Sequence, residues 1–319
     1  MSDLTVKETA ALLRQMDDVL ILTHIRPDGD TVGCASALCL ALRALGKRAY
    51  LLPNPGQTRT TAPYFAPCEA PEGFAPKYVV STDIASRGLL PDNAQPYRDR
   101  IDLAIDHHPS FERFAAANIV RPEAAACGEL IYDILCQLGP VTAETALPLY
   151  VAVSTDTGCF QYSNTTPSTH RVAAALMETG IDFRAVNKIF FRTKSRKRMA
   201  LEGDMLANME FYDEGRVAVL KVPISLMERV DADESDAEDL SALGGQIEGV
   251  DCAVTMRELR PDVWKFSVRT GERINACSVC ARLGGGGHAA AAGATVSGTL
   301  EEARAAVLGA IRAVQETGG

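Results

Sequence analysis

The sequence lacks the long apolar segment that a membrane protein needs. Its 319 residues are 47% hydrophobic, but they contain no run of about 18 or more apolar residues, and the first residues do not join a basic start to an apolar core. The nine cysteines are an odd number in a chain without an export signal, which is typical of a reducing compartment. These features predict a cytoplasmic protein that binds no membrane.

Positive charge is also scarce. The chain carries 32 Lys and Arg residues against 41 Asp and Glu residues, a formal net charge of −9. Because long duplex nucleic acid is bound through many phosphate contacts to basic side chains, this balance argues against such a partner. A short oligonucleotide or a small nucleotide needs only local positive charge and fits the composition. The sequence leaves open whether the chain forms a homodimer.

Two motifs of nucleophilic and nucleotide-binding enzymes are absent. The sequence contains neither a Gly-x-Ser-x-Gly turn, which presents a serine nucleophile, nor a Gly-x-x-x-x-Gly-Lys-Ser/Thr loop, which cradles phosphates. If the chain is a hydrolase, water is therefore the expected nucleophile.

Acidic and histidine side chains follow short apolar runs at four places. The runs 19–22, 78–82 and 101–105 are bounded by turn residues and have the composition of buried parallel strands. The run 151–155 precedes Asp156 in the same manner. Because ligands gather at the carboxyl ends of parallel strands, we expect these side chains to meet. The side chains presented in this way are His24, Asp28, Asp30, Asp83, Asp106, His107, His108 and Asp156.

Such a concentration of carboxylates predicts bound cations. Asp28, Asp30, Asp83 and Asp156 would repel one another and would be costly to desolvate, and two divalent ions would balance their charge. Asp28 and Asp30 can diverge toward different ions if Gly29 lets the backbone bend between them. Mixed oxygen and imidazole ligands favour Mn²⁺, with Mg²⁺, Fe²⁺ or Co²⁺ as alternatives, and no suitably placed cysteine indicates structural zinc.

Each cluster taken alone has a simpler interpretation. An isolated Asp-Gly-Asp is more often a solvated turn, and an isolated His-His pair is more often surface or core than ligand. The metal interpretation is favoured because all of these residues follow apolar runs within one half of the chain.

The motifs together resemble a known family. The order His-x-x-x-Asp-x-Asp, strand-end Asp, Asp-His-His and Thr-Asp-Thr-Gly resembles the DHH phosphoesterase superfamily. The segment 283–293, LGGGGHAAAAG, resembles the glycine-rich signature of that superfamily's associated C-terminal domain. Order, spacing and length are most similar to the branch of oligoribonucleases (nanoRNases) and 3′-phosphoadenosine 5′-phosphate phosphatases, and the resemblance spans nearly the whole chain.

The resemblance implies a ligand scheme of two metals that share the carboxylate of Asp83. In this scheme one metal is held by His24, Asp28 and Asp83, and the other by Asp30, Asp83, His107 and Asp156.

The resemblance also implies the chemistry. His108 would face the scissile phosphate or the leaving oxygen. Asp106 would orient a ligand histidine without itself binding a metal. Two metals about 3.5–4 Å apart acidify a bridging water and neutralise charge on the phosphoryl group, so hydrolysis is the expected reaction. The implied catalytic residues are Asp83, Asp106, His107 and His108.

The second half of the chain is expected to bind the substrate. Four glycines at 284–287 can let the backbone approach an anionic ligand, and His288 can donate to a phosphate. Arg269, at the end of the strand-like run 263–268, matches the position of a substrate-phosphate arginine in the family. Taken alone, a run of glycines is more typical of a flexible loop, and a single arginine at a strand end can equally be a surface charge. The expected substrate-binding residues are Arg269, Gly285, Gly286, Gly287 and His288.

The predicted function is a two-metal phosphoesterase. It would hydrolyse oligonucleotides of a few residues to mononucleotides, and also 3′-phosphoadenosine 5′-phosphate to AMP. One alternative is a pyrophosphatase or polyphosphatase, as in the related family II pyrophosphatases, which resemble only the first half of the chain. A second alternative is a catalytically silent nucleotide-binding regulator that has kept the fold.

The predicted fold is α/β and has two domains. Residues 1–185 form a metal-binding catalytic domain, a mostly parallel sheet flanked by helices. Residues 186–210, with the basic run 192–198, form a helical connector. Residues 211–319 form a smaller substrate-binding α/β domain with a mixed sheet and the glycine-histidine motif. Further predicted elements are helices at 31–45, 128–138, 143–153, 169–177, 237–246 and 274–283, and strands at 48–52, 216–222, 252–259 and 263–269.

Overall fold

The structure is a computed structural model that describes residues 3–237, 240–271 and 273–316. The chain divides into two compact units, Met1–Thr193 and Lys194–Gly319. The division falls inside the stretch 186–210 that was predicted to be a connector. Residues 186–193 belong to the first unit, and residues 194–210 belong to the second.

The first unit contains a parallel sheet with the strand order β2-β1-β3-β4-β5, so the α/β fold with a parallel sheet is confirmed. Along β1, Leu20 and Leu22 pack on one face of the sheet, and Val19 and Ile21 pack on the other, as the twofold period of a strand requires. Both faces are buried, which explains why the run 19–22 is continuously apolar. The strands are β1 Val19–Leu22, β2 Ala49–Leu51, β3 Tyr78–Thr82, β4 Leu103–Asp106 and β5 Ala117–Val120.

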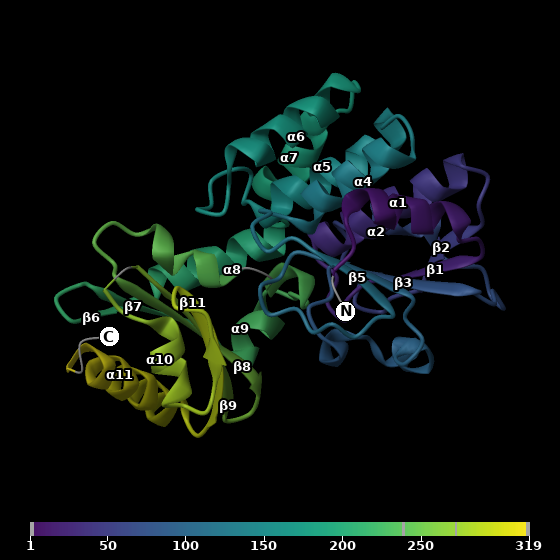
Figure 1. Cartoon of the computed structure of the whole chain (residues 1–319). Helices are drawn as coiled ribbons and strands as arrows, with labels where there is room; N and C mark the ends of the chain where they lie inside the picture. The colour runs from purple at the N-terminus through teal and green to yellow at the C-terminus, as the bar shows by residue number, and fades with distance from the viewer. Residues whose placement is uncertain (1–2, 238–239, 272, 317–319) are drawn as a thin grey trace. The chain divides into compact units, whose positions relative to one another are not determined.

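Helices cover one face of this sheet, where α1, α2 and α4 lie together in Figure 1. The other face is covered by connecting segments that contain the short 3-10 turns η2 Arg87–Leu89 and η3 Asp92–Tyr97. The helices of the unit are α1 Val6–Gln15, α2 Gly29–Ala44, α3 Ala62–Phe65, α4 Cys127–Leu138, α5 Ala143–Asp156, α6 Pro167–Glu178 and α7 Phe183–Asn187, with η1 Ala66–Cys68 and the π-helical turn η4 Lys188–Arg192.

Two sequence expectations overlap at residues 151–153, and only one is right. The predicted helix at 143–153 is confirmed as α5, whereas the strand-like interpretation of 151–155 is wrong, because these residues form the end of that helix and Asp156 is its final residue. Helix α5 is buried against α2 and α4, so its residues are apolar on most sides. Hydrophobic periodicity cannot separate such a buried helix from a buried strand over a short run.

The second unit contains a mixed sheet with the order β10-β11-β9-β8-β7-β6, in which β7 and β8 are parallel and the other neighbours antiparallel. Helices α10 and α11 pack on one face and α8 on the other. The elements are α8 Arg196–Ala207, β6 Glu210–Tyr212, β7 Val217–Val222, α9 Ile224–Arg229, β8 Cys252–Arg260, β9 Val263–Thr270, α10 Ala276–Ala281, β10 Gly286–Gly287, β11 Ala291–Ser297 and α11 Leu300–Glu316.

The predicted helix at 237–246 was also wrong. The described residues there form three 3-10 turns, η5 Ser235–Ala237, η6 Leu240–Ala242 and η7 Gly244–Gln246, while residues 238 and 239 lie outside the described residues. Consecutive glycines weaken a helix, and Gly244 sits so close to the sheet that a β-carbon on it would lie 2.7 Å from the β-carbon of Ala253. The predicted helix at 274–283 is shorter, because Asn275 caps the start of α10.

Among the described residues, no helix is long and apolar enough to cross a membrane.

Candidate metal centre

The carboxyl edge of the parallel sheet in the first unit gathers the predicted ligands. His24 follows β1, Asp83 follows β3, and His107 follows β4. The His107 Nε2 atom lies 3.5 Å from Asp83 Oδ1, 3.5 Å from Asp156 Oδ2 and 3.7 Å from Asp30 Oδ2. These five residues come from three strand ends and two helix ends, so only the folded chain brings them together.

Helix α2 supplies both aspartates of the first motif. Asp28 is the N-cap of α2, and its Oδ1 accepts hydrogen bonds from the backbone N–H groups of Asp30 and Thr31, at 3.0 and 3.1 Å. The other oxygen of Asp28, Oδ2, lies 3.5 Å from His24 Nε2. Gly29 lies inside the helix and does not act as a bend between the aspartates. It is needed instead because a β-carbon there would lie 2.3 Å from Thr155 Oγ1.

The ligand atoms form overlapping groups. In each group every potential ligand atom lies within 4.8 Å of the others. Asp83 and His107 each belong to two of the three groups, so the groups form one continuous cluster. The groups are His24, Asp28 and Asp83; Asp30, His107 and Asp156; and Asp83, His107 and His108.

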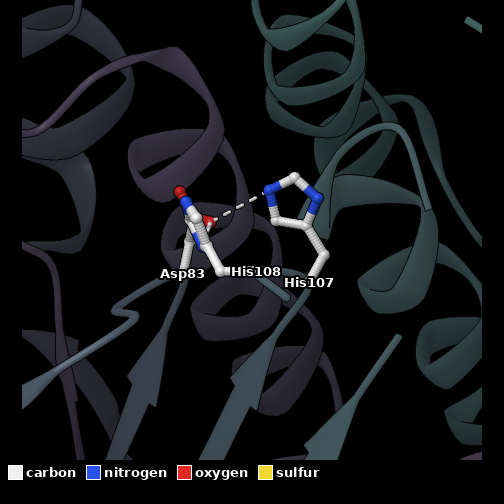
Figure 2. A group of neighbouring side chains, drawn as sticks. All are labelled: Asp83, His107 and His108. Atoms are coloured by element: carbon white, nitrogen blue, oxygen red, sulfur yellow. Dashed lines mark ion pairs between the residues drawn. The ribbon is translucent and has the colours of Figure 1, made fainter. Parts of the chain in front are cut away.

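Asp83 lies at the centre of this cluster, and Figure 2 shows His107 pointing toward its carboxylate. Its backbone is left-handed, with φ of 57°, and its N–H donates to Ile105 O at 2.9 Å, which turns the side chain at the strand end. The Oδ1 atom is buried and accepts no hydrogen bond within the described part of the chain. A buried carboxylate oxygen without a donor is costly, and a cation would satisfy it.

The electrostatics of the cluster also favour cations. Burial raises the pKa of Asp30 and of Asp83 well above the usual value, and neighbouring aspartates raise it further. Burial raises the pKa of Asp156 to about 6. Without positive charge, these carboxylates resist ionisation together. The donor set of carboxylates and imidazoles therefore fits divalent metal ions.

The two adjacent histidines are held by different partners. His107 Nδ1 lies 3.0 Å from Ala124 O, so this nitrogen donates to the carbonyl and Nε2 is left to face the carboxylates. Asp106 Oδ1 instead accepts from the backbone N–H of His108 at 2.6 Å and from His108 Nδ1 at 3.0 Å. The hydrogen bond to Asp106 raises the pKa of His108.

Asp106 was expected to orient a metal-ligand histidine, but its contact in the structure is with His108 and not with His107. The reason is local. Asp106 is fully buried, and its Oδ1 atom reaches both the backbone N–H and the ring of the residue two positions on. The Nδ1 atom of His107 is instead hydrogen-bonded to the carbonyl of Ala124, which lies in the segment before α4.

Several residues around the ligands had no sequence signal. Asp30 accepts from the backbone N–H groups of Cys127 and Gly128 at the start of α4, and from the thiol of Cys34. The Nδ2 atom of Asn54 donates to Thr23 Oγ1 at 2.9 Å and to His24 O at 2.8 Å, which fixes the end of β1. Asn-Pro-Gly at 54–56 has the composition of a turn, so the sequence offers no hint of this role.

The predicted substrate-binding residues lie in the second unit. Arg269 is half-buried near the end of β9, and its Nη1 atom donates to Val268 O at 3.2 Å. His288 is exposed directly after β10, and its backbone N–H donates to Ala291 O at 2.8 Å.

The glycines before His288 serve different purposes. A β-carbon on Gly285 would lie 2.1 Å from Gly293 O, and one on Gly287 would lie 2.6 Å from Ala291 O. These two glycines therefore allow close approach to β11, and their role in substrate binding stays a prediction. Gly284 and Gly286 are exposed and have open space at their β positions, so a ligand can reach both.

Models of two protein families match the chain. The model of the DHH family, N-terminal domain, matches residues 18–154, and the model of the DHHA1 domain matches residues 215–316. The first match covers the strands that carry His24, Asp83 and His107, and the second covers Arg269 and His288.

Relatives extend over nearly the whole length. The bifunctional oligoribonuclease and PAP phosphatase NrnA of Thermus thermophilus is 34% identical over 308 residues, covering 92% of this chain and 89% of that protein. The protein of the same name from Bacillus subtilis is 23% identical over 286 residues, covering 88% and 90%. The crystal structure of an exopolyphosphatase-related protein from Bacteroides fragilis has the same fold, with a TM-score of 0.88, 22% identity and coverage of 98% and 96%.

Proposed function

The chain belongs to the DHH family of phosphoesterases, and on that premise we propose that it uses two divalent metal ions to hydrolyse short oligonucleotides to mononucleotides and 3′-phosphoadenosine 5′-phosphate to AMP. We further propose that it works in the cytoplasm and takes no long duplex as substrate.

The observation that carries this proposal is the sharing of Asp83 between ligand groups. A carboxylate oxygen of Asp83 lies within 4.8 Å of potential ligand atoms of His24 and Asp28 in one group and of His107 in another. The Oδ1 atom of Asp83 is also buried without a hydrogen bond from the described residues. A single carboxylate in this position can bridge two cations. Mn²⁺ is the metal that we favour, because carboxylates and imidazoles are combined and no cysteine belongs to the groups.

Each residue of the cluster has a role in this proposal. When bound, the paired metals would supply a water of lowered pKa and positive charge against the phosphoryl oxygens. Asp30, His107 and Asp156 would hold one metal, and His24 and Asp28 the other. His107 is fixed for this purpose by its hydrogen bond to Ala124 O.

His108 is proposed to act on the leaving oxygen. Its ring is partly exposed, and Asp106 holds Nδ1 at 3.0 Å, so Nε2 is the nitrogen available to substrate. The neighbouring carboxylate raises the pKa of His108 and thereby keeps the ring protonated closer to neutral pH. A protonated Nε2 can donate its proton to the oxygen that departs from phosphorus.

The substrate class rests on the relatives and on the second unit. Two proteins similar along nearly the full length carry the name oligoribonuclease and PAP phosphatase. Arg269, Gly286 and His288 offer a guanidinium, an open backbone position and an imidazole, which together suit a phosphate or nucleotide.

A substrate panel with Mn²⁺ tests the proposal. Di- and trinucleotides, adenosine 3′,5′-bisphosphate, pyrophosphate and a long duplex would be compared at equal concentration by product chromatography. We expect mononucleotides and AMP to form much faster than phosphate forms from pyrophosphate. Equal or reversed rates would favour the pyrophosphatase alternative. Nucleotide binding without any turnover would favour the silent regulator.

A further inference from the structure

Building on the proposed two-metal function, we propose that Cys34 is a positioning residue for Asp30. In this role the thiol holds one oxygen of the Asp30 carboxylate, so that only the other oxygen is presented to the metal of the group formed by Asp30, His107 and Asp156.

The contact between the two residues is direct and buried. Cys34 lies one turn after Asp30 on α2, and its Sγ atom donates to Asp30 Oδ1 at 3.1 Å. Cys34 has no exposed surface, and Asp30 is 1% exposed. Water therefore cannot replace this donor without entering the core.

The first turn of α4 supplies two more donors to the same carboxylate. The N–H of Gly128 donates to Asp30 Oδ1 at 3.0 Å, and the N–H of Cys127 donates to Oδ2 at 2.7 Å. These N–H groups lack partners inside the helix and favour negative charge. Gly128 allows the approach, because a β-carbon there would lie 2.8 Å from the β-carbon of Ala152 on α5.

The donors are divided unequally between the two oxygens. Oδ1 accepts two hydrogen bonds, from Cys34 and Gly128, whereas Oδ2 accepts one, from Cys127. A carboxylate oxygen has about two acceptor positions, so Oδ1 is saturated and Oδ2 keeps one free. Oδ2 is also the oxygen that lies 3.7 Å from His107 Nε2. Asp30 would therefore bind the metal through Oδ2 alone.

Removal of the thiol would free one position on Oδ1. The carboxylate would then be held only by the backbone N–H groups of Cys127 and Gly128, and the freed position on Oδ1 could compete with Oδ2 for the metal. Hydrogen-bond partners that orient a metal ligand typically contribute about 10- to 100-fold to metal affinity. Affinity should be lost at one of the two metal sites only. Among the described hydrogen bonds, Cys34 makes none to a residue of the group formed by His24, Asp28 and Asp83.

The test compares three variants of the full chain. Cys34→Ala removes the donor, and Cys34→Ser retains a hydroxyl donor at the same place. Cys39→Ala is the matched control, because Cys39 is equally buried on α2 but its thiol donates to Ala49 O, at 3.1 Å, and has no hydrogen bond to Asp30. Mn²⁺ binding would be measured by calorimetric titration and by electron paramagnetic resonance, and folding by circular dichroism of the metal-free proteins.

We expect wild type and Cys39→Ala to bind two ions alike. Cys34→Ala should weaken one of the two sites about 10- to 100-fold and leave the other unchanged, and Cys34→Ser should restore the lost affinity to within a few-fold. If Cys34→Ala binds both ions as wild type does, or if it weakens both sites as a general loss of packing would, the inference is overturned while the proposed function stands. If the wild type binds no divalent ion, the proposed function fails together with the inference.

Discussion

Gly29 and Thr155 touch so closely that a β-carbon on Gly29 would lie 2.3 Å from Thr155 Oγ1 and 2.8 Å from the Thr155 β-carbon. The contact joins the first residue of α2 to the last turn of α5. Gly29 separates Asp28 from Asp30, and Thr155 immediately precedes Asp156. This close approach therefore helps to set the spacing between carboxylates from distant parts of the chain.

Gly29→Ala should push α2 away from α5. We expect the free energy of unfolding of the metal-free protein to fall by about 1–3 kcal/mol, as overpacked cores do, and Mn²⁺ affinity to fall with it. Chemical denaturation and metal titration measure the two effects. Gly309→Ala, on the exposed side of α11 with open space at the β position, is the control and should raise stability by about 0.5–1 kcal/mol. Unchanged stability and metal binding in Gly29→Ala would contradict this account.

Asp83→Ala should remove the ligand that we propose both metals share. We expect binding of both ions to weaken and turnover of dinucleotides to fall at least about a thousandfold, since a lost metal contact costs several kcal/mol of transition-state stabilisation. Metal analysis of the purified variant and steady-state kinetics would check this. An active Asp83→Ala variant with two bound ions would rule out the bridging role.

The raised pKa of Asp156 predicts that the stability of the metal-free protein depends on pH. Its pKa is raised in the folded state to about 6, so its stabilising contribution is complete at pH below its unfolded-state pKa of about 4 and is lost as the pH rises through 6. Asp156→Asn has no such titration. The variant should therefore gain stability relative to wild type between about pH 4 and pH 7 in the presence of a chelator, as measured by urea unfolding. If the stability difference between wild type and Asp156→Asn did not change with pH, the pKa of Asp156 would not be raised.

The same protonation governs metal binding. Because only the ionised carboxylate coordinates a cation, metal affinity of the wild type should rise with pH across the same interval. Calorimetry at pH 5, 6 and 7 would show whether this occurs.

Asp106→Asn should alter the pH profile of catalysis. Asp106 raises the pKa of His108, so its loss should lower that pKa and move the alkaline limb of kcat to lower pH. Bound metal should be retained, because Asp106 belongs to none of the ligand groups found among the described residues. A profile identical to wild type would mean that His108 does not act as a proton donor.

Arg269→Ala should weaken substrate binding and leave both metals in place. The expected signature is a higher KM for adenosine 3′,5′-bisphosphate with unchanged Mn²⁺ content, as for the loss of a charge-assisted hydrogen bond. Arg260→Ala, which removes an exposed arginine at the other end of the β8–β9 pair, is the charge-matched control. Loss of metal from Arg269→Ala would show that the residue has another role.

Strands β1 and β3 could be predicted from the sequence because most of their residues are buried, on both faces of the sheet. The run 19–22 is continuously apolar, the run 78–82 begins with three apolar residues, and the structure places strands β1 and β3 there. The same property misled the interpretation of 151–155, since a helix enclosed by α2 and α4 is apolar in the same way. Strand β5 and helix α11 were not predicted at all.

The chemical nature of the site was also contained in the sequence. Aspartates and histidines placed after apolar runs predict a cation site at one edge of a parallel sheet, because the carboxyl ends of parallel strands share that edge. This reasoning needs only residue types and their order, and both are local properties of the chain.

Only the tertiary structure decided which atoms face one another. The hydrogen bonds of Asp30 to Cys127 and Gly128 join residues almost a hundred positions apart, and no periodicity relates them. The same is true of the pairing of Asp106 with His108 and of Gly29 with Thr155. Such contacts depend on how α2, α4 and α5 pack against one another. The sequence by itself therefore determined the kind of side chains at the candidate metal centre, and the packing of distant elements determined their orientation.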